Sequence, residues 1–203
     1  MKHLRLPLQR EEVEALQVGD MVLISGEVTV TIGLPTHKRM VELLDRGEPL
    51  PIDLKDGAFF HLSCFNRASA DGSQYEALYW NPTTSTRYNP YMPRLIEGCG
   101  LRLVGGKGGL DAASVEALRR QGCVYLSFLG GGCTLLSQAI RRVVCVHWTD
   151  YIEQFRLLTL EVADLGPATV AIDAHGNSVY AQLQTQAAQR LHALRTAEGA
   201  RPS

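Results

Sequence analysis

The sequence predicts an α/β domain with a mixed sheet or a compact barrel-like β part and flanking helices. Two observations favour this fold class: the N-terminal part of the chain is rich in β-forming residues, and strand-like and helix-like segments alternate in the part that follows. The length of 203 residues suits one domain, for which we expect the bounds 1–197. The last residues, 198–203, are expected to form a disordered tail.

The first elements are predicted from composition and spacing. An acidic segment over 9–17 indicates a short helix or turn, and two β-rich stretches follow over 21–26 and 28–32. Thr36 is suited to cap a helix over 37–46, because its hydroxyl can accept a hydrogen bond from a free backbone N–H group.

In the middle of the chain, the sequence predicts a β region over 58–64 and 76–80, joined by a turn that contains Asp71-Gly72. A helix over 90–99 is expected next. Asp111 should cap a helix over 111–121, in which apolar residues recur at helical spacing. The remaining expected elements are strands over 101–104, 124–129, 143–148, 157–165 and 169–173, and helices over 134–142 and 182–197.

The bulk composition excludes several classes of protein. A formal net charge of −1 argues against a nucleic-acid binder, which normally carries a basic excess. No apolar run is long enough to span a membrane, and the segment Met1–Pro7 lacks the apolar core of a signal peptide. Five widely spaced cysteines without a CxxC pair indicate reduced, mostly buried thiols in a cytoplasmic protein, and their spacing supports no metal site.

Two short polar loops are the strongest candidates for a functional site. The first carries Thr83, Thr84, Ser85 and Arg87, and the second carries Lys107 between pairs of glycines. Together they predict an anion site, because Arg forks onto a carboxylate while Lys supplies a point charge. Neither loop contains a metal-ligand set or a general base. We therefore expect the chain to supply only part of an active site.

Each loop also has a purely structural interpretation. The Thr-rich loop resembles a polar helix cap, and Lys107 can be a solvated residue in a flexible turn. Pro82 and the density of small polar residues before a helix favour the anion site for the first loop. The second loop lacks the spacing of a nucleotide-binding P-loop, so nucleotide binding is not expected.

Other polar residues admit a functional role. Lys38 and Arg39 begin a predicted helix, where cations are unfavourable unless an anion is present. Asp173 and His175 could form an acid–base pair, although the segment also has the composition of a turn. Cys133 follows three glycines at a predicted helix start, where a buried structural thiol is the simpler interpretation.

These motifs, in this order, resemble the β subunit of the iron–sulfur-dependent hydro-lyases, a family that includes L(+)-tartrate dehydratase and the C-terminal domain of class I fumarases. The resemblance covers nearly the whole chain. It is carried by Val18-Gly19-Asp20 with Ser25-Gly26, His37-Lys38-Arg39, Pro82-Thr83-Thr84-Ser85 with Arg87, Gly105–Gly109, Val146-His147-Trp148, Gly166-Pro167 and Ile172-Asp173 with His175-Gly176-Asn177.

The resemblance implies a swivelling β/β/α domain that docks on a separate α subunit in a hetero-oligomer. That subunit would hold a [4Fe–4S] cluster with one open iron, while this chain would hold no metal. By the same resemblance Thr83 falls on the catalytic base, and Lys107 and Arg87 on residues that bind a small carboxylic acid. Thr84, Ser85, Lys38 and Arg39 are further substrate-binding candidates.

The sequence departs from the family pattern at one carboxylate-binding position. An Arg-Asp pair is expected just before His37, and the segment Ile32–Thr36 has none. Loss of a charged hydrogen bond costs roughly 1.5–3 kcal/mol, which is enough to change the substrate. A monocarboxylate, or a dicarboxylate with an apolar substituent near Leu34, fits this change, and Lys38 and Arg39 are the candidates to compensate.

Three hypotheses follow. The first is a hydro-lyase β subunit that hydrates or dehydrates a 2-hydroxy (di)carboxylic acid of the fumarate, malate or tartrate type. The second is a catalytically degenerate, anion-binding or regulatory subunit of the same family. The third is an enzyme that works alone through Asp173 and His175.

Overall fold

The computed structural model describes residues 1–72 and 74–199. Most of its strands form one mixed sheet of seven strands, and two further strands form a hairpin. The strands are β1 (Lys2–Arg5), β2 (Met21–Val30), β3 (Ala58–Phe60), β4 (Leu62–Ala68), β5 (Tyr75–Pro82), β6 (Leu103–Gly106), β7 (Val124–Ser127), β8 (Ile140–His147) and β9 (Leu157–Ile172).

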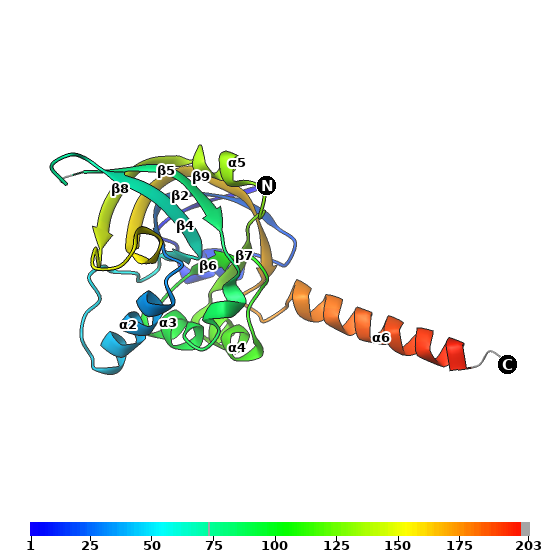
Figure 1. Ribbon diagram of the computed structural model, residues 1–203. Helices are drawn as coiled ribbons and strands as arrows, with labels where there is room; N and C mark the ends of the chain where they lie inside the picture. The colour runs from blue at the N-terminus through cyan, green and yellow to red at the C-terminus, as the bar shows by residue number, and fades with distance from the viewer. Residues whose placement is uncertain (73, 200–203) are drawn as a thin grey trace.

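The seven-stranded sheet has the order β1-β2-β3-β6-β7-β9-β8, and β2 also pairs with β9. That extra pairing closes β2, β3, β6, β7 and β9 into a barrel (Figure 1). Strands β2, β3, β6 and β7 run parallel, while β9 is antiparallel to each of its partners. The predicted mixed, barrel-like α/β fold is therefore confirmed.

Three helices lie together on one side of the barrel, and one helix projects away from it (Figure 1). The projecting helix is α6, whereas α2, α3 and α4 form the group. The helices are α1 (Arg10–Glu14), α2 (Leu34–Asp45), α3 (Met92–Gly98), α4 (Ala112–Gln121), α5 (Cys133–Ser137) and α6 (Val179–Gly199), with 3₁₀ turns η1 (Ser85–Tyr88) and η2 (Glu153–Phe155).

The core has two parts, one inside the barrel and one between the barrel and the helices. Because successive side chains of a strand point to opposite faces, Phe60 packs in the first part and its neighbour Phe59 in the second. Leu103 and Val104 divide in the same way. The short parallel strands are therefore apolar on both faces, which is why their sequences lack polar alternation.

Several expected elements are confirmed. Asp111 caps α4, where its carboxylate accepts a hydrogen bond of 2.9 Å from the N–H of Ser114. The turn at Asp71-Gly72 joins β4 and β5 as a hairpin. The stretches expected over 21–26 and 28–32 form one strand, β2, whose pairing shifts register near Gly26.

Other expectations are wrong at their boundaries. Thr36 does not cap α2, which begins at Leu34 because Pro35 fits the first turn of a helix. The helix expected over 134–142 ends at Ser137, and Ile140–Arg142 instead pair with β9, where Arg142 also forms an ion pair with Glu161. Strand pairing at long range outweighs local helix preference in this segment.

The C-terminal helix is longer than expected. It begins at Val179 and runs to Gly199, so the first two residues of the expected tail are helical. The rest of that tail, residues 200–203, lies outside the described residues. None of the helices in the described part of the chain combines the length and the apolar character needed to cross a membrane.

Candidate functional site

The candidate site lies at the carboxyl ends of the parallel strands β3, β6 and β7, the edge at which open α/β sheets bind their ligands. His61 follows β3, Lys107 follows β6, and the glycines of segment 130–132 come shortly after β7. The Thr-rich loop follows β5 and reaches the same edge, because Thr83 N–H donates to the carbonyl of His61 at 2.9 Å.

The two polar loops that the sequence singled out are held together by their backbones. Thr84 and Lys107 pair as an isolated parallel β-bridge. Lys107 N–H donates to the carbonyl of Thr83 at 3.0 Å, and Ser85 N–H donates to the carbonyl of Lys107 at 2.8 Å. We call residues 83–85 together with Lys107 the polar bridge.

Gly106 makes this close approach possible. A Cβ atom at this position would lie 3.0 Å from the carbonyl oxygen of Thr83 and 3.1 Å from Cβ of His61, and it would collide with Oγ of Ser85. Only a residue without a side chain therefore fits between β3 and the Thr-rich loop.

Lys107 in the polar bridge and Arg87 in the turn η1 are cations without a protein partner of opposite charge in the described part of the chain. Neither Lys107 nor Arg87 forms an ion pair within the described residues. Lys107 is half-buried, and its ammonium lies beside the loop after β7, where a Cβ atom at Gly130 would be 3.8 Å from Nζ. Lys107 is thus a half-buried cation without a counter-charge, as an anion site requires, whereas Arg87 is exposed.

Ser85 lies beneath the polar bridge. Its side chain is fully buried, and its Oγ atom is 2.8 Å from Nδ1 of His61 and 2.8 Å from the hydroxyl of Tyr125, which donates to it. Burial lowers the pKa of His61 well below its usual value, so the imidazole is neutral. Ser85 is therefore placed to support the loop rather than to face solvent.

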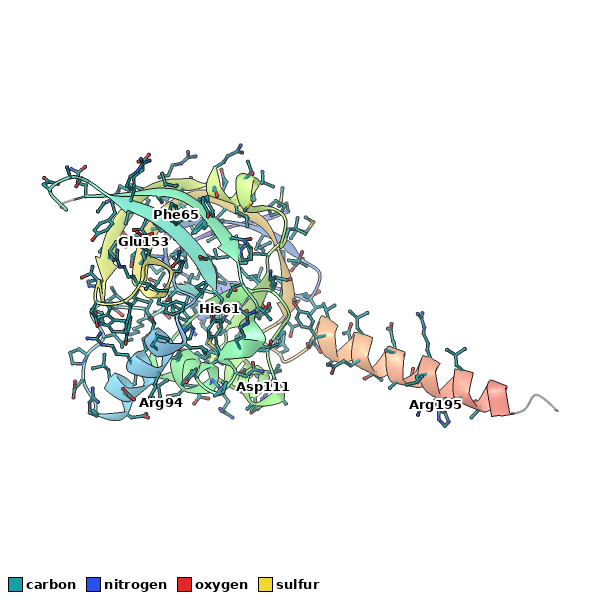
Figure 2. All side chains as sticks on the ribbon, in the orientation of Figure 1. His61, Phe65, Arg94, Asp111, Glu153 and Arg195 are labelled. Carbon is teal, nitrogen blue, oxygen red and sulfur yellow. The ribbon has the colours of Figure 1, made fainter. Side chains whose placement is uncertain are left out.

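A stack of buried rings continues from this contact. The ring of Tyr88 packs against those of both His61 and His37, with centroid distances of 4.3 and 4.1 Å, and the two imidazole rings are 5.2 Å apart. Burial lowers the pKa of His37 to about 4 and raises that of Tyr88 to about 12. The hydroxyl of Tyr88 donates to the carbonyl of Ile32 at 2.8 Å, so the stack ties the start of α2 to the Thr-rich loop. Figure 2 shows His61 between the barrel and the helices.

Lys38 and Arg39 are engaged elsewhere. Lys38 is exposed and lies 3.8 Å from the carboxylate of Glu42. Arg39 is 3.1 Å from the carboxylate of Asp150 and stacks over the ring of Trp148 at 4.7 Å. No described contact joins either residue to the polar bridge.

Within the segment that lacks the expected arginine, the space beside Gly33 is filled by another part of the chain. A Cβ atom at Gly33 would lie 2.8 Å from Cβ and 2.9 Å from Cα of Phe155. Thr31 and Thr36 both donate their hydroxyls to the carbonyl of Phe155, and Ile32 N–H donates to that of Gln154 at 3.2 Å. The turn η2 thus fills the space next to Gly33.

Asp173 and His175 have structural roles. Asp173 is buried and accepts hydrogen bonds from the backbone of His175 and from Asn177, which closes a turn. The ring of His175 bonds to the carbonyl of Glu14 at 3.0 Å. Both residues therefore stabilise the junction before α6, and no contact makes them an acid–base pair.

Buried thiols do not form a metal site. Burial raises the pKa values of Cys64 and Cys99 to about 12, which disfavours the thiolate that iron requires. In the described part of the chain no group of three or more His, Cys, Asp and Glu residues is placed to hold a metal ion. Cys133, at the start of α5, is half-buried and unpaired with another cysteine.

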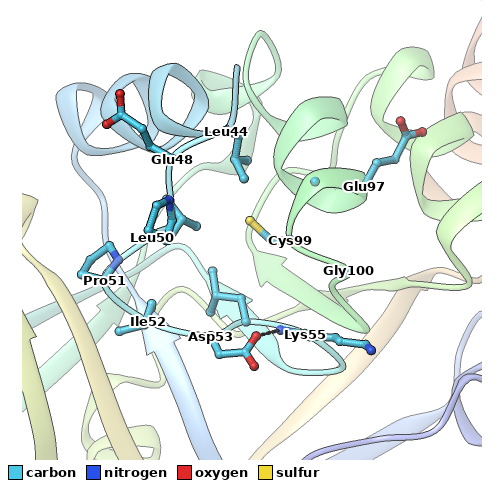
Figure 3. Close-up of a pocket in the computed structure, with 13 residues that line it drawn as sticks. Leu44, Glu48, Leu50, Pro51, Ile52, Asp53, Lys55, Glu97, Cys99 and Gly100 are labelled. Atoms are coloured by element: carbon cyan, nitrogen blue, oxygen red, sulfur yellow. Dashed lines mark hydrogen bonds between the residues drawn. The ribbon is translucent and has the colours of Figure 1, made fainter. Parts of the chain in front are cut away.

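A separate cavity of about 600 Å³ lies at the opposite edge of the sheet (Figure 3). It is formed by the segments before β3 and β6, including Leu50, Ile52 and Cys99. Because the site loops follow the carboxyl ends of the same strands, this cavity is not part of the candidate site.

Sequence reasoning missed His61, Tyr88 and Tyr125. Each is a single polar or aromatic residue in or beside an apolar segment, and such residues are usually structural. Their contacts with Ser85 and with one another span 24 to 40 residues of chain. The available signal was the position of His61 directly after a buried strand at the ligand-binding edge.

Comparisons with known proteins identify the family and several relatives of this chain. Residues 2–183 match the protein family described as "Fumarase C-terminus". The L(+)-tartrate dehydratase subunit beta of Escherichia coli (strain K12) is 31% identical over 189 residues, which cover 93% of this chain and 91% of the relative. A putative L(+)-tartrate dehydratase subunit beta of Methanocaldococcus jannaschii is 30% identical over 92% of this chain and 95% of its own length. A putative fumarate hydratase class I of Geobacillus stearothermophilus is 29% identical over 93% of this chain, but over 35% of its own length.

Proposed function

This chain belongs to the fumarase C-terminus family as a beta subunit of the hydro-lyase kind, and we propose that it supplies half of an active site that adds water to, or removes it from, a 2-hydroxy acid. One observation carries the proposal. Lys107, which is far from the Thr-rich loop in sequence, is held beside it at the carboxyl edge of the sheet by two backbone hydrogen bonds, one with Thr83 and one with Ser85.

Lys107 and Arg87 bind the carboxylate of the substrate in this proposal. Neither has a counter-charge among the described residues, so an incoming anion gains their attraction without breaking an existing ion pair. Thr84 lies in the same bridge and offers a half-buried hydroxyl as a further donor. Ser85 supports these residues from below rather than touching the substrate.

Thr83 takes the proton that is removed from the substrate carbon during dehydration. A threonine hydroxyl is weakly acidic, so it can act as a base only where positive charge stabilises its ionised form. Lys107, bonded through its backbone to Thr83, is the nearest candidate for that charge. In the hydration direction the same hydroxyl returns the proton.

The other half of the site belongs to a partner in a hetero-oligomer. The thiols of this chain do not fit an iron–sulfur cluster, because Cys64 and Cys99 are desolvated and no group of potential metal ligands is found among the described residues. We therefore assign the [4Fe–4S] cluster to an alpha-type subunit, where an iron with an open position would act as a Lewis acid. Five free cysteines support a reducing, cytoplasmic location.

The substrate differs from a simple dicarboxylate. Phe155 occupies the space beside Gly33, in the segment where the arginine is expected, and that segment carries no cation. Arg39 is held by Asp150 and Trp148, which argues against compensation from that residue. A monocarboxylate, or a dicarboxylate with an apolar group that faces Leu34, fits a site with Lys107 and Arg87 as its cations.

A degenerate, anion-binding subunit is the second candidate, and the closed space at Gly33 favours it. Anaerobic co-expression with the alpha-type subunit separates the two, followed by iron analysis and a turnover assay on a panel of 2-hydroxy acids. We expect turnover that Thr83→Ala and Lys107→Ala abolish without unfolding the chain, and that the exposed control Thr86→Ala retains. An iron-loaded complex without turnover on the whole panel would establish the degenerate subunit instead.

A further inference from the structure

Helix α6 leaves the domain and extends away from it (Figure 1). It has 21 residues, and every side chain over 181–196 is exposed. Arg195 stands far from the barrel on this helix (Figure 2). The helix thus has almost no contact with the rest of its own chain beyond its first turn.

The helix also lacks the interactions that stabilise a solvated helix. No ion pair involves α6 in the described part of the chain, and the hydroxyls of Thr185 and Thr196 bond only to carbonyls of the same helix. An isolated helix is only marginally stable in water, and most helices in proteins depend on packing of one face. A partner that covers one face of α6 is therefore expected.

One face of α6 is suited to such packing. Leu183, Ala187, Leu191 and Leu194 recur at helical spacing and fall within about 80° of one another around the axis, at 100° per residue. We call these four residues the apolar stripe. Its leucines are 57%, 50% and 63% exposed, which is a large apolar surface to leave in water.

The charges beside the apolar stripe indicate the chemistry of the surface that would pack on it. Arg190 lies at one edge of the stripe and Arg195 lies beyond the other edge, while Glu198 is the single acidic residue of the helix. Two copies of α6 packed on each other would bring these arginines together with little compensating charge. An apolar groove with acidic residues on both rims is complementary to the stripe.

The root of α6 lies next to the candidate site. The ring of Tyr180 packs against Gly109, where a Cβ atom would lie 2.5 Å from the ring, and it contacts the ring of Tyr125 at a centroid distance of 6.2 Å. Gly109 is two residues after Lys107. A subunit that faces Lys107 and completes the site therefore also meets the beginning of α6.

We propose that α6 is an arm on which the alpha-type subunit docks, with an acid-rimmed apolar groove of that subunit around the apolar stripe. This inference rests on the proposed function, because it takes its partner from it. The family-model match ends at residue 183, the first residue of the apolar stripe. The arm lengthens the contact between the subunits without changing the groups that meet the substrate.

The test compares two double variants of the full chain in complex formation with the alpha-type subunit. The first, Leu183→Glu with Leu191→Glu, places two acidic residues on the stripe. The control, Gln182→Glu with Gln189→Glu, makes the same change of charge on the opposite face, and both variants keep residues that favour helix. Circular dichroism and thermal melting verify that both remain folded.

We expect the stripe variant to bind the alpha-type subunit at least tenfold more weakly than the wild type, and the control to bind within twofold. Turnover of the stripe variant should recover at saturating partner, since the residues of the polar bridge are unchanged. If both variants bound the alpha-type subunit equally well, the proposal that α6 is a docking arm would be rejected, while the proposed function would remain intact. Self-association of the wild-type chain that requires Leu191 would overturn it in favour of a second copy. Failure of the wild type to bind would reject the proposed function and the arm together.

Discussion

Oγ of Ser85 lies 2.8 Å from Nδ1 of His61, and both side chains are fully buried. This contact joins the first residues after β3 to the loop after β5, at the point where Thr84 and Lys107 pair. The position of the polar bridge therefore depends on a hydrogen bond that neither loop can form alone.

Ser85→Ala should destabilise the fold and disturb the polar bridge. The change leaves Nδ1 of His61 buried without a partner, which costs about 1–3 kcal/mol, and removes one hydrogen bond of the Tyr125 hydroxyl. Urea denaturation should show a loss of at least about 1 kcal/mol in the free energy of unfolding. Thr86→Ala, at an exposed position, should change it by less than about 0.5 kcal/mol. Equal stability of the two variants would remove Ser85 from its supporting role.

Gly106→Ala should impair the site more than the same change at Gly131. The new methyl group at residue 106 meets the backbone of Thr83 and the side chains of Ser85 and His61, whereas no atom lies within 4 Å of the corresponding position at Gly131. Overpacking of this kind costs about 1–3 kcal/mol. Thermal melting and carboxylate binding by calorimetry measure both effects. If the Gly106→Ala protein had the same melting temperature as the wild type, the backbone would have to shift at this point to accommodate the methyl group.

Gly33→Ala should lower the melting temperature, because the added Cβ atom collides with the backbone and side chain of Phe155. Leu34→Ala is the matched control, since the side chain of Leu34 is 46% exposed and its truncation removes little packing. The same comparison tests the proposed substrate: Gly33→Arg should not improve turnover of dicarboxylates. A stable Gly33→Arg protein with a lower KM for a dicarboxylate would contradict the closed space beside Gly33.

Stability should fall below about pH 6.5. His37 and His61 are buried and neutral, and burial lowers the pKa of His37 from 6.5 to about 4. In acid the unfolded chain therefore binds protons that the folded chain does not, so the loss grows from about pH 6.5 down to about pH 4. For His37 alone the difference corresponds to about 3 kcal/mol.

Urea denaturation at pH 7.5 and at pH 5 measures this dependence on pH. His37→Phe keeps an aromatic ring against Tyr88 but removes the titrating group, so its stability should depend less on pH. His3→Gln, at an exposed position, is the control and should follow the wild type. If the free energy of unfolding changed equally with pH in His37→Phe and in the wild type, His37 would not be responsible for the loss of stability in acid.

Local signals predicted much of the fold. The cap at Asp111 and the hairpin at Asp71-Gly72 depend on side chains and turns that act within a few residues, and both are present. The prediction of a helix over 134–142 was wrong at its end, because Ile140–Arg142 pair with residues of β9 that lie some 20 residues further along the chain. A strand that is stabilised by a distant partner leaves little trace in its own sequence.

The candidate site divides in the same way. Thr83, Arg87 and Lys107 could be named from loop composition, because hydroxyls and cations among glycines are rarely needed for packing. The sequence also suggested Lys38 and Arg39, which the structure pairs with Glu42 and Asp150. An ion pair depends on which charges meet in space, so a basic run alone does not identify a free cation.

The sequence by itself determined the fold class, the two polar loops and the family to which the chain belongs, since these depend on composition, periodicity and the order of motifs. Only the tertiary structure decided that Ser85 is buried on His61, that Phe155 fills the space at Gly33, and that α6 stands free of the domain. Each of these depends on contacts, or on their absence, between segments that are distant along the chain. Such contacts are fixed by the packing of the whole core rather than by any local preference.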